Sequence, residues 1–307
     1  ASAWIKCHYP AVFLCGLLNS QPMGFYSPSM LIQDARRHGV TVLPVDVAQS
    51  DWESRVDETG AVRLGLREIR GLAAEKGQKI AVDRKIRTFS SIADLTVRCG
   101  LGKRELEILA AADALQSLAG HRRQAAWQVA DSALHPGKAV QGDLFAGLDG
   151  SLAADLETPG ESVSLPAPSL GENLVADYRH VGHSLRAHPL SLLRQALRDR
   201  RFLCARDLPG QGDKALVRVA GIVTGRQRPG TATGIVFVTL EDESGWINVV
   251  VNPQLVERQR RELLAAQLLG IYGQLQQAEG VTHVFAQRLV DLSGWLGRLE
   301  THSRDFH

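Results

Sequence analysis

The stretch ALVRVAGIVTGRQRPGTATGIVFVTLEDESGWINVVVN, residues Ala215–Asn252, predicts three short β-strands. In the first strand, Val217, Val219 and Val223 fall on one face, and alternation with a period of two is typical of a half-buried strand. The turn that follows, Gly225–Gly234, contains two arginines, two threonines and three glycines. Glycine lets backbone amides approach a ligand closely, and arginine pairs with phosphate through a planar fork. The turn is therefore a candidate for contacts with phosphate.

Two further strand-like runs complete the pattern. Leu268–Leu275 and Val281–Leu289 follow a polar helical stretch at Pro253–Ala266. Five strands with a helix between the third and the fourth predict an OB-fold β-barrel, which often binds single-stranded nucleic acid. A barrel used only for protein contacts is the alternative. If the barrel binds DNA, the expected contact residues are Arg226, Arg228, Thr231, Thr233, Phe237 and Trp246.

The fold class expected for the rest of the chain is multidomain α+β. Residues 1–60 predict helices at Trp4–Ser20 and Pro28–His38, then an extended piece at Val40–Val47. The expected segments after these are a unit of short helices punctuated by glycine at 61–135, an acidic linker at 136–170, a helical connector at 171–205, the barrel at 206–292, and a polar tail at 293–307 that frays.

Composition narrows the class of protein. The 307 residues, 44% of them hydrophobic, fit two or three compact units, and no apolar run is long enough to cross a membrane. The chain opens without methionine inside an apparent helix, so we expect it to be part of a longer protein. Its four cysteines are isolated, which indicates neither a zinc site nor a disulfide framework and fits a reducing cytoplasm. They are Cys7, Cys15, Cys99 and Cys204.

The net charge of +2 conceals an asymmetry between neighbouring blocks. From Gly60 to Ala125 there are 13 Lys/Arg against 7 Asp/Glu, whereas from Ala130 to His180 there are 2 against 8. A basic block beside an acidic one suggests a phosphate-facing module followed by a solvated linker. Charge alone leaves open that both blocks are ordinary surface.

Two glycine turns lie in the basic block, at Ile69-Arg70-Gly71-Leu72 and Gly100-Leu101-Gly102-Lys103, each between helical segments. Each resembles a helix-hairpin-helix motif, which directs the amides of a helix N-terminus toward a backbone phosphate. Such turns also occur between packed helices that bind nothing. The second turn lacks the spacing of a P-loop. The expected DNA contacts here are Arg70, Gly71, Lys76, Gly100, Gly102, Lys103 and Arg104.

The acidic linker contains Gln141-Gly142-Asp143-Leu144-Phe145. This peptide resembles the short motif that docks on bacterial sliding clamps. Leu144 and Phe145 would fill an apolar pocket, and the Gln141 amide would bond to the clamp backbone. The alternative is that Leu144 and Phe145 anchor the linker to its own chain.

Catalytic motifs are absent from the sequence: there is no HExxH, no GxSxG and no clear Cys–His pair. Glu241-Asp242-Glu243 is the only dense carboxylate cluster, and we expect it to be a solvated turn at a strand end rather than a metal site. We therefore predict no catalytic and no metal-binding residue in this chain.

Taken together, these residues resemble the C-terminal third of a bacterial C-family DNA polymerase of the α-subunit type, and its error-prone, damage-inducible branch in particular. The segments that carry the resemblance are WIKCHYPAVFLCGLLNSQPMGFYSP, RLGLREIRGL, CGLGKRELEILAAADAL, SLRAHPLSLLR, RQRPGTATGIVFVTLEDESG and DLSGWLGRLETHSRDFH. LLNSQPMGFY and RQRPGTATG are the most specific of these and favour the error-prone branch.

The resemblance implies that residues 1–60 are the end of the polymerase fingers and that a palm with two Mg²⁺ ions lies before Ala1. No residue here matches the catalytic carboxylates, so the expected role of this chain is to bind primed duplex DNA, single-stranded DNA and partners without polymerising. Family members of this kind also act in translesion DNA repair with an inactive polymerase-like adaptor and a RecA-like accessory protein. The competing class is a protein-interaction scaffold for the adaptor with little DNA affinity. A tRNA-binding domain is disfavoured, because no aminoacylation motif is present.

Overall fold

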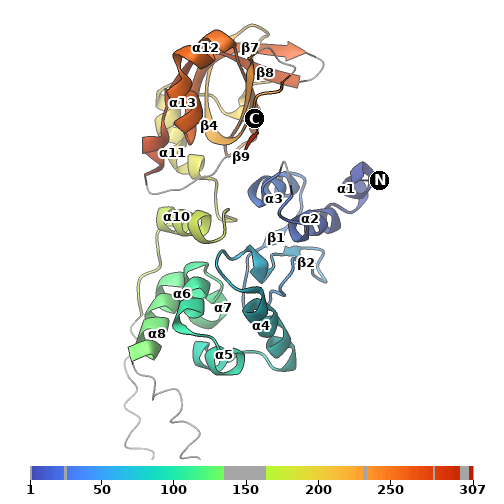
Figure 1. Ribbon diagram of the computed structural model, residues 1–307, viewed down its shortest axis with the longest axis vertical. Coiled ribbons are helices and arrows are strands. Elements are labelled where there is room, and N and C mark those ends of the chain that lie inside the picture. Colours follow the sequence, from blue (N-terminus) through green and yellow to red (C-terminus); the bar gives the residue numbers. More distant parts are fainter. Residues whose placement is uncertain are drawn as a thin grey trace, which may run out of the picture. The chain divides into compact units, whose positions relative to one another are not determined.

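The computed structural model describes residues 2–23, 26–134, 164–230, 234–278, 281–297 and 304–306. The chain forms two compact units, Ala1–Leu185 and Arg186–His307, which are described one after the other. Figure 1 shows the first as mostly helical and the second as a β-barrel with short helices.

The first unit begins with α1 (Ser2–His8), α2 (Pro10–Asn19) and α3 (Pro28–Arg37). The single helix expected over Trp4–Ser20 is divided at Tyr9, whose ψ of 58° is not helical. Pro10 then begins α2, because proline has no amide hydrogen and is tolerated in the first turn. The helix expected at Pro28–His38 is confirmed, and the Ser27 side chain caps it by accepting from the amide of Met30.

A small sheet follows, built from β1 (Val42–Leu43), β2 (Arg55–Val56) and β3 (Val62–Arg63). The central strand β3 is parallel to β1 and antiparallel to β2. Only two residues of the extended piece expected at 40–47 pair as a strand. The sheet joins residues on either side of position 60, and one hydrophobic core runs from Leu14 to Val129.

Short helices make up the rest of this unit. They are the 3₁₀ turn η1 (Leu66–Glu68), α4 (Ala74–Ile86), α5 (Ile92–Cys99), α6 (Lys103–Ala111), α7 (Gln116–Ala119), α8 (Arg122–Leu134) and α10 (Leu170–His180). The helical segment expected before Gly71 is corrected to a single 3₁₀ turn. Strand β3 ends at Arg63 and the left-handed Gly71 turns the chain, which leaves little room for a helix between them.

A buried ion pair holds helix α10 to α8 within the first unit. The guanidinium of Arg122 on α8 donates to Asp177 on α10, and both residues are less than a tenth exposed. The Ser184 hydroxyl donates to the second Asp177 oxygen at 2.6 Å. Charges this deeply buried are tolerated only when they are paired and hydrogen-bonded. Burial also lowers the pKa of the neighbouring His183 to about 4.

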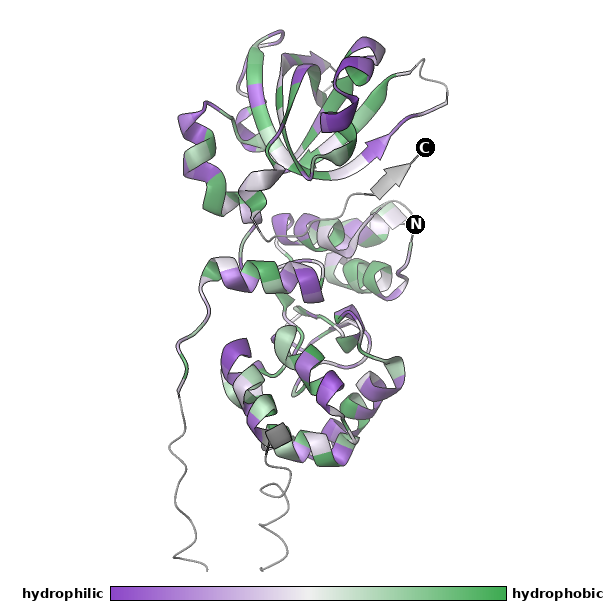
Figure 2. Ribbon diagram, turned by 60° about the vertical axis from the view of Figure 1, so that its left-hand side comes forward, coloured by the Kyte–Doolittle hydropathy of each residue, from purple (hydrophilic) through white to green (hydrophobic). Residues whose placement is uncertain are grey.

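The second unit is a closed five-stranded barrel made of β4 (Leu216–Gln227), β5 (Val236–Glu241), β6 (Trp246–Val251), β7 (Leu268–Ala278) and β8 (Val281–Asp291). The strand order is β5-β6-β8-β7-β4, and β4 pairs with β5 to close it. Only β6 and β8 run parallel among these pairs. Valine, leucine and isoleucine fill the interior, and Figure 2 shows this hydrophobic content along the strands. The predicted OB-fold barrel is confirmed.

Helices and short turns cover the barrel. They are α11 (Pro189–Asp199), η2 (Ala205–Asp207), α12 (Pro253–Arg258), α13 (Arg260–Ala265) and η3 (Ser293–Leu296). The tail expected to fray instead contains η3 and a further strand, β9 (Arg304–Phe306), which pairs in parallel with Gly225–Gln227 of β4. The backbone of β4 extends past the end of β7, so it offers β9 an edge for pairing.

Candidate nucleic-acid interface

The second glycine turn joins α5 to α6 in a tight hairpin. Gly100 has a φ of +59°, a left-handed conformation that glycine adopts without strain, and its carbonyl accepts a hydrogen bond from Lys76. Leu101 is 6% exposed and packs into the core between the helices. The predicted helix-hairpin-helix motif is confirmed at this turn.

The N-terminus of α6 points its first amides away from the helix. The Glu105 carboxylate accepts from the Gly102 amide at 2.9 Å, and the first intrahelical bond runs from Leu106 to the Gly102 carbonyl. The amides of positions 103–105 therefore precede the helical bonding pattern, and the positive end of the helix dipole lies here.

Two cations flank this helix end. Lys103 and Arg104 are both exposed, and Lys103 makes only a loose ion pair with Glu107, at 3.8 Å. Exposed pairs of this kind contribute little and are screened by salt. The hairpin therefore presents two side-chain cations next to helix amides, the combination that binds a phosphate.

The first glycine turn has the same backbone sense but different neighbours. Gly71 has a φ of +83°, and a Cβ added there would lie 3.5 Å from Ile108 of α6. The Arg70 guanidinium donates to the carbonyls of Tyr178 and Arg179 at the end of α10, both at 3.3 Å. Lysine and arginine side chains commonly satisfy the last carbonyls of a helix in this way.

Lys76 on α4 also contacts its own chain. Its Nζ donates to the Gly100 carbonyl at 2.8 Å and so ties the first hairpin to the second. Of the hairpin cations expected to contact DNA, Arg70 and Lys76 bind the protein, whereas Lys103 and Arg104 face solvent.

In the barrel, Arg226 and Arg228 have different surroundings. Arg226 is 6% exposed, and its guanidinium donates to the carbonyls of Leu263 and Ala266, both at 2.6 Å. These bonds fasten α13 to β4, which is a structural role rather than the expected contact with DNA. Arg228 is exposed in the turn that follows. Thr231 and Thr233 lie outside the described residues.

The aromatic residues expected at the interface lie on the outer face of the barrel. Phe237 on β5 is 37% exposed and Trp246 on β6 is 38% exposed. Phe285 on β8, which the sequence analysis missed, is 41% exposed. Pairing aligns Phe237 with Val250 and Val250 with Phe285, so the two phenylalanines share one row across three strands. The alternation in Val281–Asp291 places Phe285 outward, but only the register brings it into one row with Phe237, with Val250 between them.

The carboxylate cluster after β5 is buried, not solvated as expected. Asp242 is fully buried and accepts from the amide of Ala205 at 2.8 Å. Arg194 on α11 donates to Glu243 and also lies 3.4 Å from Asp242. Burial on its own would raise the pKa of Glu243, but the hydrogen bond from Arg194 outweighs burial, and the pKa is lowered. The cluster therefore anchors α11 to the barrel.

No group of three or more metal-ligating side chains occurs in the parts of the chain that the structure describes. Over the same residues, no helix is both long and apolar enough to cross a membrane. The clamp-like peptide, with Gln141, Leu144 and Phe145, lies outside the described residues.

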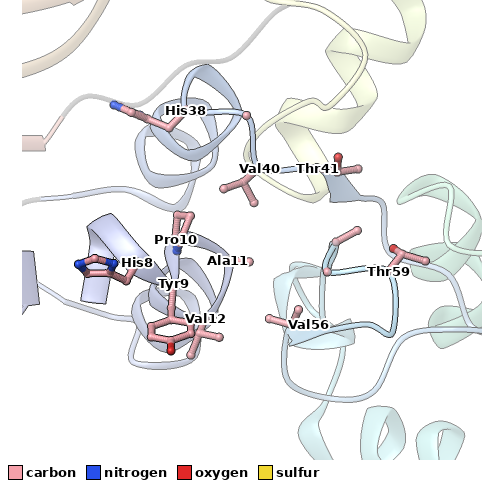
Figure 3. A pocket seen from close by; sticks show the side chains of 13 residues that line it. His8, Tyr9, Pro10, Ala11, Val12, His38, Val40, Thr41, Val56 and Thr59 are labelled. Carbon is pink, nitrogen blue, oxygen red and sulfur yellow. The ribbon is translucent and has the colours of Figure 1, made fainter. Parts of the chain in front are cut away.

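A pocket of about 500 Å³ opens in the first unit between α2, the end of α3 and the β2–β3 turn. Its lining includes His8 and His38, with Pro10, Val40 and Val56 among mostly small or apolar neighbours (Figure 3). Because no lysine or arginine is among its described lining residues, this pocket does not extend the cationic surface of the hairpins.

Two family models match the chain. Residues 39–125 match a helix-hairpin-helix motif, and residues 217–292 match an OB-fold nucleic acid binding domain. Among solved structures, the chain is similar to asparaginyl-tRNA synthetase from Pyrococcus horikoshii, with 20% identity, a TM-score of 0.26, and coverage of 30% of this chain and 23% of that chain.

Over its whole length the chain is 65% identical to a protein named error-prone DNA polymerase from Dechloromonas aromatica (strain RCB). The chain is a relative of the error-prone DNA polymerases. A second protein of that name, from Azoarcus sp. (strain BH72), is 56% identical over the whole chain. The chain covers 29% and 28% of these two relatives, less than a third of their length. The predicted resemblance to this polymerase family is confirmed.

Proposed function

We propose that this chain is the DNA-holding part of an error-prone DNA polymerase. The observation that carries the proposal is the N-terminus of α6, where exposed Lys103 and Arg104 flank the first helix amides in a helix-hairpin-helix turn. Contacts of this type bind phosphate and carry no sequence information, so a polymerase can hold any duplex in this way.

The barrel would hold single-stranded template on the face of β5, β6 and β8. Phe237 and Phe285 offer half-exposed rings on β5 and β8, with β6 between them, and bases stack on such rings with little sequence preference. Arg228 lies at the end of this face nearest the turn after β4 and would contact the backbone. The proposed contact residues are fewer than the sequence predicted, because Arg226 bonds to carbonyls of its own barrel.

The remaining parts of the proposal concern the longer protein. Polymerisation across damaged template, with Mg²⁺ held by palm carboxylates, would be carried out by another part of the longer protein. Gln141–Phe145 would tether the polymerase to a sliding clamp, and an inactive adaptor with a RecA-like protein would complete the cytoplasmic translesion complex. The motif Q-x-x-L-F and its position between the hairpins and the barrel support the clamp contact.

The test is binding of the full chain to primed duplex and to single-stranded DNA over a range of salt concentrations. We expect affinity for both, with a steep salt dependence. Phe237→Ala with Phe285→Ala should weaken single-strand binding by roughly 1–3 kcal/mol per stacked base and leave duplex binding unchanged. Salt-insensitive binding of an adaptor protein without DNA affinity would instead support the scaffold role.

A further inference from the structure

A cluster of arginines stacked on aromatic rings lies on strand β7 and its neighbours. Pairing aligns Arg218 of β4 with Tyr272 of β7, and Tyr272 with Arg288 of β8. The guanidinium carbons of Arg218 and Arg288 lie 4.9 Å and 5.6 Å from the centre of the Tyr272 ring. Two cations therefore share one aromatic ring, each within the range of a cation–π interaction.

Arg200 and Trp295 extend this cluster along the outside of the barrel. The Arg200 guanidinium carbon lies 4.3 Å from the centre of the Trp295 ring, and the Arg200 carbonyl accepts from Arg218 at 3.2 Å. The edge of the Phe202 ring packs against Tyr272, with 5.8 Å between the ring centres, and holds it in place. We name Arg200, Arg218, Tyr272, Arg288 and Trp295 the β7 cluster.

The charges of the β7 cluster are not neutralised within the described part of the chain. No carboxylate there forms an ion pair with Arg200, Arg218 or Arg288, and Arg200 and Arg288 are exposed. Arg194 shows the opposite arrangement in the same unit, because it is buried against Asp242 and Glu243. The guanidiniums of Arg218 and Arg288 share one ring without a counter-charge and repel each other, so an anion bound beside them would stabilise the cluster.

The geometry of these guanidiniums favours phosphate. Contact with an aromatic ring restrains each guanidinium, and the N–H groups that remain can donate to the oxygens of a phosphate group. Side chains held in this way lose less rotamer entropy on binding than solvated lysines do.

The β7 cluster and the aromatic row adjoin on β8, which carries both Arg288 and Phe285. From β8 the cluster continues over β7 and β4, whereas the row continues over β6 to Phe237 on β5. We propose that the β7 cluster is a second binding surface, for the phosphate backbone of a single-stranded nucleic acid that continues past the aromatic face. This proposal rests on the proposed function of the barrel and extends the binding surface from β5, β6 and β8 onto β7 and β4.

The experiment measures binding of two oligothymidylates to the full chain as salt is varied. One has about 8 nucleotides, within the usual span of a single OB barrel, and the other roughly 30. Arg218→Ala with Arg288→Ala should leave the short oligonucleotide unaffected and weaken the long one roughly tenfold. The salt slope for the long one should fall by about 1.4 units, since each phosphate contact on a single strand contributes about 0.7.

The matched control is Arg258→Ala with Arg261→Ala, which removes the same charge from exposed positions of α12 and α13. It should leave both affinities nearly unchanged, and thermal melting checks that both double variants are folded. Equal weakening by the two double variants, or unchanged binding of the long oligonucleotide, would overturn the second surface while leaving the barrel proposal intact. Failure of the unaltered chain to bind either oligonucleotide would overturn both.

Discussion

The turns at Gly71 and Gly100 share a left-handed glycine followed by a buried leucine, yet they contact different partners. At the first turn, Arg70 bonds to the end of α10 and Lys76 to the Gly100 carbonyl. At the second turn, Lys103 and Arg104 face solvent beside the helix amides. The same local motif thus bonds to the protein itself at the first turn, and at the second it forms the exposed helix end for which we propose phosphate binding. The difference lies in what packs around each turn and not in the turn itself.

The first hairpin bonds to the end of α10, and the attachment of α10 depends most strongly on Asp177. Asp177→Ala leaves the buried Arg122 guanidinium without its main partner, and we expect the first unit to lose about 3–5 kcal/mol of stability. Urea unfolding measures this. Glu172→Gln removes the exposed charge that pairs with Arg123 but keeps a side-chain oxygen that can accept from Ser169, so it should cost less than about 1 kcal/mol. Similar losses for both variants would mean that the buried pair is not what holds α10.

Acid should lower the stability of the same region, because it protonates the buried His183. Burial lowers its pKa to about 4 from an ordinary value of 6.5, so the folded state disfavours the protonated form. The stability from the neutral ring is complete above about pH 6.5 and is lost as pH falls toward about 4, by up to about 3 kcal/mol. Unfolding midpoints of the unaltered chain and of His183→Gln, compared between pH 7 and pH 5, measure this. A stability that rises with acid in the unaltered chain alone would contradict the sign.

Duplex binding should separate the two hairpins directly. Lys103→Gln with Arg104→Gln should weaken primed-duplex binding roughly tenfold and lower the salt slope by about two units, because each phosphate contact on a duplex contributes about 0.9. Arg70→Gln with Lys76→Gln removes the same charge but should have a much smaller effect on the slope. If the Arg70/Lys76 variant lowered the salt slope as much as the Lys103/Arg104 variant, both turns would be phosphate sites, and the two hairpins would not differ in function.

The smallest expected effect concerns the glycines of the second hairpin. Gly100→Ala forces a side chain into the left-handed region and should cost about 1–2 kcal/mol of stability. Gly102 has an ordinary φ of −84°, and a Cβ there meets only the flexible Glu105 carboxylate at 2.8 Å. Gly102→Ala should therefore cost less, and thermal melting compares the two. A larger loss at Gly102 would show that the Glu105 cap, rather than the backbone turn, controls this hairpin.

Sequence pattern predicted the elements of this chain better than it predicted what their side chains contact. Glycine position and hydrophobic alternation are local signals, so the second hairpin and the barrel strands could be read from them. The burial of Arg226 depends on carbonyls of Leu263 and Ala266, about forty positions away, and no local pattern encodes that distance. Phe285 was missed for the same reason, because its place in one row with Phe237 depends on the register of β6 against β5 and β8.

The parallel pairing of β6 with β8 also sets the order in which the barrel can fold. Strands β4, β5 and β6 are synthesised first. One edge of β4 stays unpaired until β7 has been made, and one edge of β6 stays unpaired until β8 has been made. Closure therefore depends on contacts that are distant in sequence, which makes such folds slow to form. Until Val281–Asp291 has left the ribosome, the growing chain carries open strand edges that other chains can pair with. A chain whose synthesis ends before this segment would be an incomplete barrel with open strand edges, and it would be prone to aggregation.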